Sequence, residues 1–279
     1  MYYFVYDAIT TKRRFERRVS QIVLNVNDLE LPHDKALVTS LNTVEALVEE
    51  ALEKDVFDTV IAVGNDRTAR SAMNAILRHR AQAHQHRNVS FGFIPIQDSG
   101  IGRMLGMPIG AEAVPIISRR RQEALDVGRM NKGFFVGSVV IRSAARFDEA
   151  KKWSHRILHG RELQPVHVRI DVNGLIVETD VAYLAISNLL AEDERAKIEK
   201  QFRVQLPRST PQDGTLQLAI LGTERNANDL TVFHATECMV ETDENVLADI
   251  DGVELRQHVF RFSLEPSTLN VIIGPNREF

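Results

Sequence analysis

The chain has 279 residues, of which 44% are hydrophobic and 26% are charged, a composition typical of globular proteins with a substantial core. Its formal net charge of −4 gives no reason to expect a nucleic-acid partner, and its single cysteine, Cys238, excludes a disulfide framework or a cysteine zinc site. The sequence begins without a basic leader and has no run of about 18 apolar residues. We therefore expect a cytoplasmic protein that does not span a membrane.

The first half of the chain alternates expected strands and helices. The expected strands are Tyr2–Tyr6, Lys35–Val38, Thr59–Val63 and Ser90–Ile96. Helical spacing of apolar residues occurs in Thr11–Val26, after the capping-box-like pair Asn42 and Glu45, from Ala69 onward, and in Ala111–Arg121. This order predicts an α/β domain with a parallel sheet and helices on both of its faces.

Strand signals dominate the second half. They cover Phe134–Ile141, Val166–Asp171, Leu175–Glu178, Val181–Ile186, Leu216–Leu221, Leu230–Ala235, Glu237–Glu241 and Val259–Leu264. Asn173-Gly174 and Asp251-Gly252 are typical hairpin turns, and Asp148–Gly160 is expected to be an inserted helix. We predict an α/β domain over residues 1–125 and a mostly antiparallel β domain over residues 126–279, with the last strand free to return to the first domain.

Ligands of parallel α/β sheets bind beyond the carboxyl ends of the strands. The apolar run Thr59–Val63 ends there in the polar turn Gly64–Thr68, and a helical pattern follows. A strand, a tight turn and a helix N-terminus together form the commonest phosphate cradle, because backbone N–H groups converge on an anion. An ordinary strand-to-helix turn is the alternative interpretation.

This stretch resembles the nucleotide-binding segment of the diacylglycerol kinase catalytic family, which includes sphingosine kinases and bacterial lipid kinases. Where that family carries GGDGT, the chain has Gly64, Asn65, Asp66, Arg67 and Thr68, so three of the five positions match. Arg67 lacks the backbone freedom of glycine, although its guanidinium could reach a phosphate instead. Loss of the cradle is the simpler interpretation.

Further segments match the family on either side of a stretch that differs from it. Ile94-Pro95 and Arg103–Pro108 match the relatives' Ile-Pro and Arg-x-Leu-Gly-Ile-Pro, whereas Gln97–Ile101 replaces their GTGND. Relatives have Asn-Pro after the first strand, and this chain has Tyr6-Asp7-Ala8. Leu125–Phe135 resembles the segment that leads into the second domain of the family. The resemblance therefore covers nearly the whole chain, and it implies the two-domain fold of the lipid kinases.

Two segments of the second half resemble motifs that carry the family's chemistry. Pro211–Leu216 resembles P-D-D-G-x-L, with Gln212 in place of the first Asp. Asp251-Gly252-Val253 resembles D-G-E, with Val253 in place of the Glu implied in deprotonating the lipid hydroxyl. Glu254 would point to the opposite face of a strand. Because four motifs are altered together, the resemblance implies that the usual mechanism of phosphoryl transfer has been lost.

The candidate site residues follow from this resemblance. The cofactor-binding candidates are Gly64, Asn65, Asp66, Arg67, Thr68, Ser99 and Gly100, and the catalytic candidate is Asp213. The family's cofactors are ATP and magnesium, whose use the altered motifs place in doubt. Asp66 and Asp213 are candidates for magnesium or substrate contact, but Asp is also common in turns. We expect no metal site at the histidines, which are His79, His84 and His86 in one tract and His155 and His159 in another.

Our leading hypothesis is a catalytically degenerate member of this family that retains binding of a lipid, a nucleotide or a partner. One alternative is an active ATP-dependent lipid kinase that uses Asp66, Arg67 and Asp213, and another is a soluble-substrate kinase of the NAD kinase type. The cationic triplet Arg119, Arg120 and Arg121 either matches a helix dipole or contacts anionic lipid at a membrane surface. A second copy of the chain or another protein is also open as partner, and no nucleic acid is expected.

Overall fold

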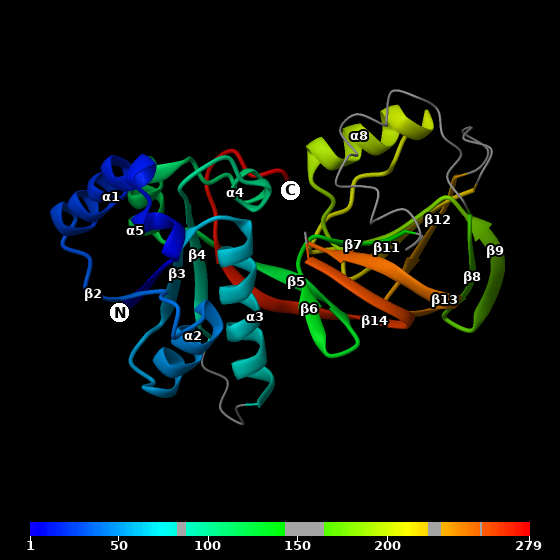
Figure 1. Ribbon diagram of the computed structural model, residues 1–279, viewed down its shortest axis with the longest axis horizontal. Coiled ribbons are helices and arrows are strands. Elements are labelled where there is room, and N and C mark those ends of the chain that lie inside the picture. Colours follow the sequence, from blue (N-terminus) through cyan, green and yellow to red (C-terminus); the bar gives the residue numbers. More distant parts are fainter. Residues whose placement is uncertain (83–87, 143–164, 223–229, 252) are drawn as a thin grey trace. The chain divides into compact units, whose positions relative to one another are not determined.

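The computed structural model describes residues 1–82, 88–142, 165–222, 230–251 and 253–279 (Figure 1). Contacts divide the chain into two compact units, Met1–Leu125 with Ser267–Phe279 and Asp126–Pro266. The end of the chain therefore belongs to the first unit. The helix expected over residues 148–160 and four of the histidines named above, at positions 84, 86, 155 and 159, lie outside the described residues.

The first unit contains a parallel sheet in the strand order β14-β4-β3-β1-β2. Its strands are β1 (Tyr2–Tyr6), β2 (His33–Leu37), β3 (Thr59–Gly64), β4 (Ser90–Pro95) and the end of β14 (Val253–Ile272). Every residue of β1, β3 and β4 is buried, as in a strand covered on both faces. The expected α/β fold with a parallel sheet is confirmed.

Helices follow or connect these strands. They are η1 (Ala8–Thr11), η2 (Arg13–Phe15), α1 (Glu16–Asp28), α2 (Val44–Glu53), α3 (Asp66–Gln82), α4 (Gly100–Met104), η3 (Gly110–Ala113) and α5 (Val114–Arg119). The helix expected from Thr11 begins only at Glu16. Two 3-10 turns precede it, and the carboxylate of Asp7 caps the first of them by accepting the N–H of Ile9. The N-cap of α2 is Thr43, since Asn42 instead accepts the N–H of Thr39 at 2.8 Å.

The prediction of a single helix over residues 111–121 is also wrong. The structure has η3 followed by α5, with a proline in the first turn of α5. Proline lacks the N–H that a continuing helix would need, so a new helix starts there. The helix ends one residue before Arg120, whose φ of 50° is left-handed.

The second unit is antiparallel and follows the order β12-β11-β10-β7-β13-β14. Its elements are β5 (Gln122–Met130), β6 (Gly133–Phe135), β7 (Ser138–Arg142), β8 (Val166–Val172), β9 (Leu175–Val181), β10 (Tyr183–Ser187), α8 (Glu192–Phe202), β11 (Leu216–Leu221), β12 (Leu230–Ala235) and β13 (Glu237–Ile250). β13 pairs with β8 up to Thr242 and with β7 from Leu247, and an irregularity between Glu241 and Val246 separates the two partners. The mostly antiparallel β fold expected for this half is confirmed.

The β8–β9 hairpin turns at the expected Asn-Gly pair. Asn173 and Gly174 have φ angles of 53° and 83°, which a two-residue hairpin of the primed type requires. The single strand expected over residues 134–141 is wrong, because the chain breaks into β6 and β7 around Val136 and Gly137. Their N–H groups bond to the side chain of Asp251 at 2.9 and 3.1 Å.

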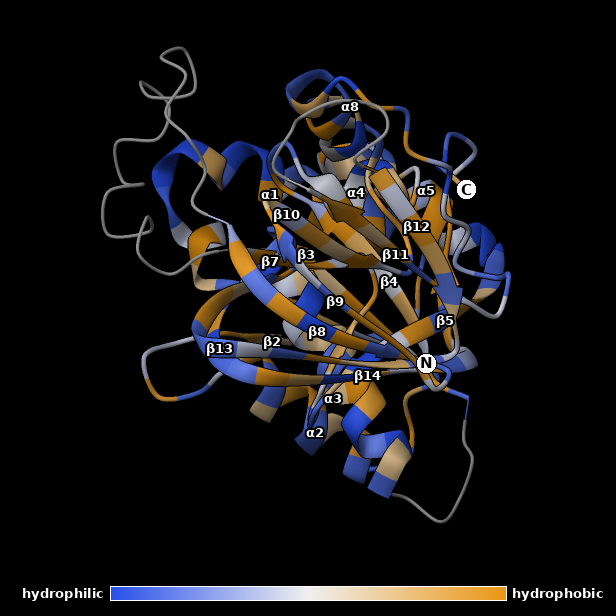
Figure 2. Cartoon of the chain, turned by 90° about the vertical axis from the view of Figure 1, so that its right-hand side faces the viewer, coloured by the Kyte–Doolittle hydropathy of each residue, from blue (hydrophilic) through white to orange (hydrophobic). Residues whose placement is uncertain are grey.

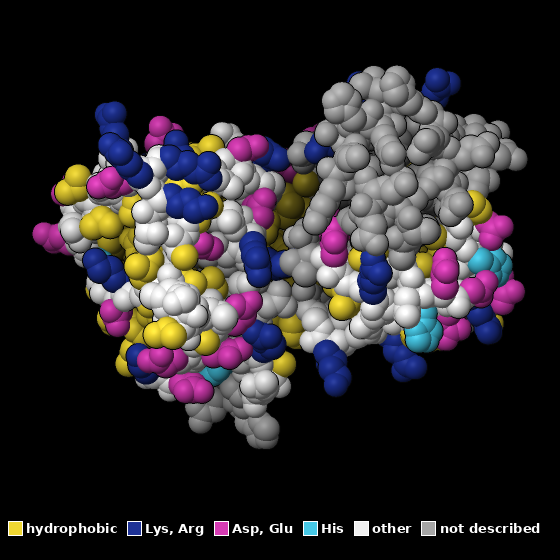
Figure 3. All heavy atoms as spheres, in the orientation of Figure 1, with side chains coloured by type: hydrophobic (Ala, Val, Ile, Leu, Met, Phe, Trp, Pro, Cys, Tyr) yellow, Lys and Arg dark blue, Asp and Glu magenta, His cyan; other side chains and the backbone are white. Residues whose placement is uncertain are grey.

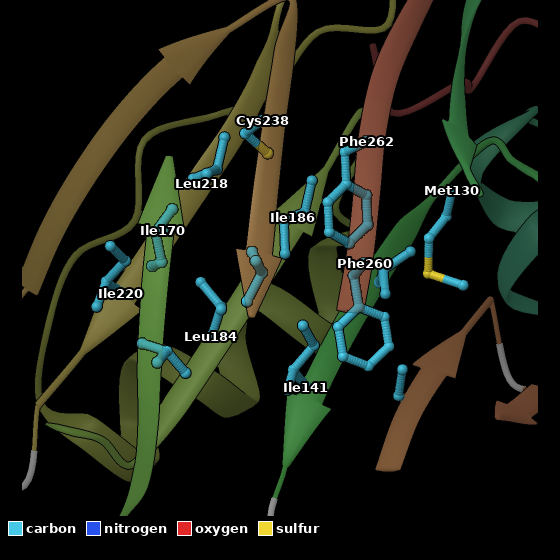
Figure 4. Packing of buried hydrophobic residues seen from close by; sticks show 14 of the residues in the cluster. Met130, Ile141, Ile170, Leu184, Ile186, Leu218, Ile220, Cys238, Phe260 and Phe262 are labelled. Atoms are coloured by element: carbon cyan, nitrogen blue, oxygen red, sulfur yellow. The ribbon is translucent and has the colours of Figure 1, made fainter. Parts of the chain in front are cut away.

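Alternation along the strands sorts the side chains of the second unit into two cores. The larger core contains Met130, Ile141, Leu184, Ile186, Leu218, Phe260 and Phe262 among others, and Figure 4 shows it from close by. The smaller core lies on the opposite face of β7, β10 and β11, where Ile198 and Phe202 of α8 pack with it. The hydrophilic and hydrophobic residues that alternate along β13 are visible in Figure 2.

Candidate functional site

The carboxyl ends of β1, β3 and β4 are joined by backbone hydrogen bonds. The N–H of Asp7 donates to the carbonyl of Val63, and the N–H of Ile96 donates to the carbonyl of Gly64, both at 2.9 Å. Arg18 of α1 donates from Nη1 to the carbonyl of Ile96. The residues that follow three neighbouring strands therefore lie at one edge of the sheet, where ligands of such folds bind.

The helix that follows β3 begins earlier than expected. Asn65 is its N-cap, because Asn65 Oδ1 accepts the N–H of Thr68 at 3.1 Å and Thr68 Oγ1 accepts the N–H of Asn65 at 3.2 Å. This reciprocal pair satisfies two backbone donors as a capping box does. Asp66, Arg67 and Thr68 therefore form the first turn of α3, and the expectation of a longer turn that ends at Thr68 is wrong.

Gly64 occupies a position where only glycine fits. A Cβ atom there would lie 2.4 Å from Thr68 Oγ1 and 2.9 Å from the Cβ of Asp7. Distances this short do not occur between real side chains, so backbone or neighbours would have to move. The absence of a side chain at Gly64 therefore lets Asp7, which follows β1, and Thr68 of α3 approach each other closely.

The carboxylate of Asp66 connects α3 to α4. Asp66 Oδ2 accepts the N–H of Gly100 at 3.0 Å, and Oδ1 accepts the N–H of Ile101 at 3.2 Å together with the hydroxyl of Ser99. Ser99 is buried, and its hydroxyl oxygen also accepts the N–H of Gly102 at 2.8 Å. Both oxygens of Asp66 are thus engaged at the start of α4.

Asp7 also binds the first turn of α3. One of its oxygens accepts the hydroxyl proton of Thr68, and the other accepts the N–H of Ile9 at 2.7 Å. Thr68 is 1% exposed, so this bond is inside the protein. The sequence showed Asp7 only as a departure from the family's pattern, and the one available signal was an Asp placed between a strand and a turn.

The first-unit candidates are therefore brought together. Gly64 and Thr68 lie against Asp7, Asn65 is hydrogen-bonded to Thr68, and Asp66 joins this group to Ser99 and Gly100. Arg67 is exposed at the first turn of α3. A magnesium–nucleotide complex needs free carboxylate oxygens and free backbone N–H groups. Asp66 accepts three hydrogen bonds and Thr68 N has a partner within the protein, so a magnesium–nucleotide complex held here would compete with these bonds.

Asp213, the catalytic candidate, lies in the second unit. It is exposed, and its Oδ1 accepts the N–H and the hydroxyl of Thr215 at 2.9 and 3.0 Å, as in an Asx turn. The adjoining Gly214 donates its N–H to Oδ2 of Asp126 at 2.9 Å. Asp126 is 2% exposed, so a buried carboxylate fixes the segment that presents Asp213.

Asp251, the first residue of the D-G-E-like segment, stabilises the backbone of the second unit. Its carboxylate accepts three successive backbone N–H groups, from Val136 at 2.9 Å, Gly137 at 3.1 Å and Ser138 at 2.8 Å. Successive N–H groups that converge in this way form an anion-binding nest. Here the protein fills the nest with its own side chain.

The cationic triplet does not present three equivalent charges. The guanidinium of Arg120 lies 4.5 Å from the centre of the Tyr2 ring, donates to the Tyr2 hydroxyl at 2.7 Å and approaches Asp58 at 3.4 Å. Arg121 lies 3.7 Å from Glu123. On the face shown in Figure 3, basic and acidic side chains are interspersed over the first unit.

Within residues 1–82, 88–142, 165–222, 230–251 and 253–279, no three His, Cys, Asp or Glu side chains are arranged as a metal would require. None of the helices described combines the length and the hydropathy of a membrane span. A polar groove of about 460 Å³ in the second unit is lined by residues of both charges, among them His167, Arg169, Glu178 and Asp243.

Comparison with known proteins finds similarity in structure but not in sequence. No family model matches the chain, and no curated protein matches it. A structure described as "A putative diacylglycerol kinase from Bacillus anthracis str. Sterne" superposes with a TM-score of 0.78 at 17% identity, over 99% of this chain and 98% of that one. Two further structures described as diacylglycerol kinases from the same organism give TM-scores of 0.79 and 0.74 at 17% and 16% identity, over 99% of this chain and 98% and 97% of theirs. The chain thus has a diacylglycerol kinase-like fold over its whole length, as the sequence resemblance implied.

Proposed function

We propose that this chain is a diacylglycerol kinase-like protein that binds a neutral glycerolipid and does not transfer phosphate from ATP by the family's usual mechanism. The fold shared with structures described as diacylglycerol kinases supports the lipid class. Activity is a property of a site rather than of a fold, so the loss of catalysis is argued from individual residues.

The single observation that carries the proposal is the engagement of Asp66. Its two oxygens accept hydrogen bonds from Ser99, Gly100 and Ile101, so the carboxylate holds the start of α4 against the start of α3. A group that binds magnesium or receives a proton needs a lone pair directed at the reactants. To free Asp66 would cost the hydrogen bonds that start α4.

The other altered motifs agree with this interpretation. Asp251 is held by three backbone N–H groups, and the position of the family's glutamate is taken by Val253. Asp213 keeps its acidic side chain exposed but binds Thr215 within its own turn. The remaining carboxylates thus have roles in the fold that are sufficient to explain their presence.

The proposal is tested with the purified full chain. We expect no saturable heat when Mg-ATP or Mg-ADP is titrated to millimolar concentration, and no thermal stabilisation by either nucleotide. We also expect no transfer of labelled phosphate from ATP to diacylglycerol in phospholipid vesicles, although the protein binds vesicles that contain diacylglycerol. Robust phosphorylation of any lipid would refute the loss of catalysis, and phosphorylation of NAD without lipid would move the chain to the NAD kinase class.

One observation favours a second candidate, an active lipid kinase with a modified site. Arg67 is exposed at the N-terminal turn of α3, where a guanidinium could pair with a phosphate. This candidate requires that Mg-ATP binds saturably, that Asp66→Ala removes the binding and that Asp213→Asn abolishes turnover. Asp98→Ala is the matched control for the first variant, because Asp98 lies in the same loop as Ser99 and is exposed.

A further inference from the structure

The turn of the β8–β9 hairpin carries the only Asn-Gly pair of the sequence (Figure 1). Every other asparagine is followed by a residue with a Cβ atom, whereas Asn173 is followed by Gly174. Both residues of the turn are exposed, and the pair formed by Val172 and Leu175 closes it. Within the described part of the chain, no hydrogen bond holds the side-chain amide of Asn173. This amide is therefore open to water.

An asparagine in this setting is chemically labile, and asparagine is among the residues that thermostable proteins avoid. The backbone nitrogen of Gly174 attacks Cγ of Asn173: the N–Cγ bond forms, the Cγ–Nδ2 bond breaks, and ammonia leaves with the proton of the N–H group. The cyclic imide that results takes up a water molecule and opens to aspartate or to isoaspartate, in which the main chain runs through Cγ. Glycine favours the attack, because it has no Cβ to hinder the approach.

The carboxylate of Asp171 restrains this reaction. Asp171 Oδ1 accepts the N–H of Gly174, the attacking group, at 2.9 Å. The nitrogen has to lose this proton before it can attack, and a hydrogen bond that it donates opposes the loss. The negative charge of Asp171 also disfavours the negative charge that would develop on the nitrogen. In the closed hairpin, one contact therefore holds the nucleophile in its unreactive form.

Deamidation would change the tip of the hairpin in two ways. Either product places a new carboxylate near Asp171, where the two negative charges repel each other. Isoaspartate also adds a methylene group to the main chain of a two-residue turn, whose φ angles of 53° and 83° follow from its tight primed geometry. The exposed apolar side chains of Leu175 and Ile176 come next in the chain. A negative charge would thus appear beside an apolar surface.

We infer that Asn173 is a site of spontaneous deamidation and that the hydrogen bond from Gly174 to Asp171 sets its rate. Water is the only co-reactant, and the product carries an additional negative charge at the hairpin tip. The reaction is slow while the turn is closed and faster whenever local opening breaks the bond. The extent of modification therefore records how long the turn has been open. This inference does not depend on the proposed function.

The test follows the full chain and the variants Asp171→Ala, Asp171→Asn and Asp180→Ala during incubation at mildly alkaline pH. Peptide mass spectrometry measures the replacement of NH₂ by OH at each asparagine over time. Asp171→Ala removes the hydrogen bond, whereas Asp171→Asn keeps an acceptor without the charge. Asp180→Ala is the matched control, because Asp180 is an exposed carboxylate of the same hairpin whose partner is His167, at 2.9 Å.

We expect Asn173 to deamidate before any other asparagine, and about three- to tenfold faster in Asp171→Ala than in the unmodified chain. Asp180→Ala should leave the rate unchanged, and Asp171→Asn should give an intermediate rate.

The same chains unfolded in guanidinium chloride give a second readout. The hydrogen bond is then absent and charges are screened, so all of them should deamidate at one rate. Earlier modification of another asparagine in the folded protein, or an unchanged rate in Asp171→Ala, overturns the inference. An acceleration by Asp171→Ala that persists in guanidinium chloride also overturns it, because the effect would then come from the neighbouring sequence and not from the folded turn.

Discussion

Oδ2 of Asp66 accepts the backbone N–H of Gly100 at 3.0 Å, across 34 residues of sequence, and so ties the first turn of α3 to the first turn of α4. This contact is the clearest case in which a residue that the family resemblance suggested for nucleotide binding supports the fold.

We expect Asp66→Ala to lower the free energy of unfolding of the first unit by about 2 to 3 kcal/mol, because three donors at the start of α4 lose a charged acceptor. Urea denaturation followed by circular dichroism measures this. Asp98→Ala is the matched control: its ion pair with Arg103 is on the surface, where such pairs are worth about 0 to 1 kcal/mol. Equal effects of the two substitutions would remove the structural role assigned to Asp66.

Gly64→Ala is expected to destabilise the protein by about 1 to 3 kcal/mol, as overpacking does. The added methyl group would lie 2.4 Å from Thr68 Oγ1. Gly133→Ala serves as control, because its nearest neighbour would be 3.8 Å away. Thermal unfolding of both variants measures the difference, and equal stability of the two variants would show that β1 and α3 are not packed as described.

Asp251→Ala should destabilise the second unit by about 2 to 4 kcal/mol, because the N–H groups of Val136, Gly137 and Ser138 lose one shared acceptor. Asp171→Ala removes a single bond, to the N–H of Gly174 at 2.9 Å, and should cost about 0.5 to 1.5 kcal/mol. Chemical denaturation of the two variants in parallel gives the comparison. A smaller loss of stability in Asp251→Ala than in Asp171→Ala would contradict the role of Asp251 as shared acceptor of the three N–H groups.

His167 gives a prediction for pH dependence. Its hydrogen bond to Asp180 raises the pKa of His167 above the ordinary value of 6.5, and the charges of Asp243 and Glu178 act in the same direction. Since the pKa is raised in the folded state, the stabilisation is fully present below pH 6.5 and is lost as the pH rises through the folded pKa. Asp180→Asn should lower the pKa of His167 in an NMR titration, and Asp171→Asn should not.

Cys238 should be almost unreactive in the folded protein. Burial raises the pKa of its thiol to about 12, and Figure 4 shows the side chain among apolar neighbours of the larger core. Because the thiolate is the reactive form, we expect Ellman's reagent at about pH 8 to react about 1000-fold more slowly with the native than with the unfolded chain. The only cysteine reports this rate without ambiguity. A fast reaction in the native state would show that the larger core opens readily.

Local patterns were sufficient for much of the fold. β11 and β12 have the bounds expected from their apolar runs, and the Asn173-Gly174 hairpin has the φ angles that its sequence requires. Some errors have a local cause, such as the proline in the first turn of α5, and others occur where a side chain from elsewhere in the sequence replaces a local partner. The strand expected over residues 134–141 breaks because Asp251 binds its backbone from 113 residues away at Ser138.

The candidate site shows the same limit. The family resemblance singled out residues 64–68 together with Ser99 and Gly100, and the structure connects these two groups through Asp66. It gave no indication that Asp7 binds Thr68, a contact between residues 61 positions apart. Periodicity and turn signals describe neighbours in sequence, so contacts of this kind become visible only in three dimensions. The roles of these residues toward a ligand stay predictions.

β14 has a consequence for the way the chain is made on the ribosome. Its first part pairs with β13, whereas Asn270 and Val271 pair with Ser90 and Phe91 of β4. The N–H of Gly274 then donates to the carbonyl of Leu105 at 2.8 Å. The parallel sheet of the first unit therefore lacks β14, the strand beside β4, until nearly the whole chain has been synthesised. Nascent chains that stall before residue 267 should accordingly be the species that chaperones retain.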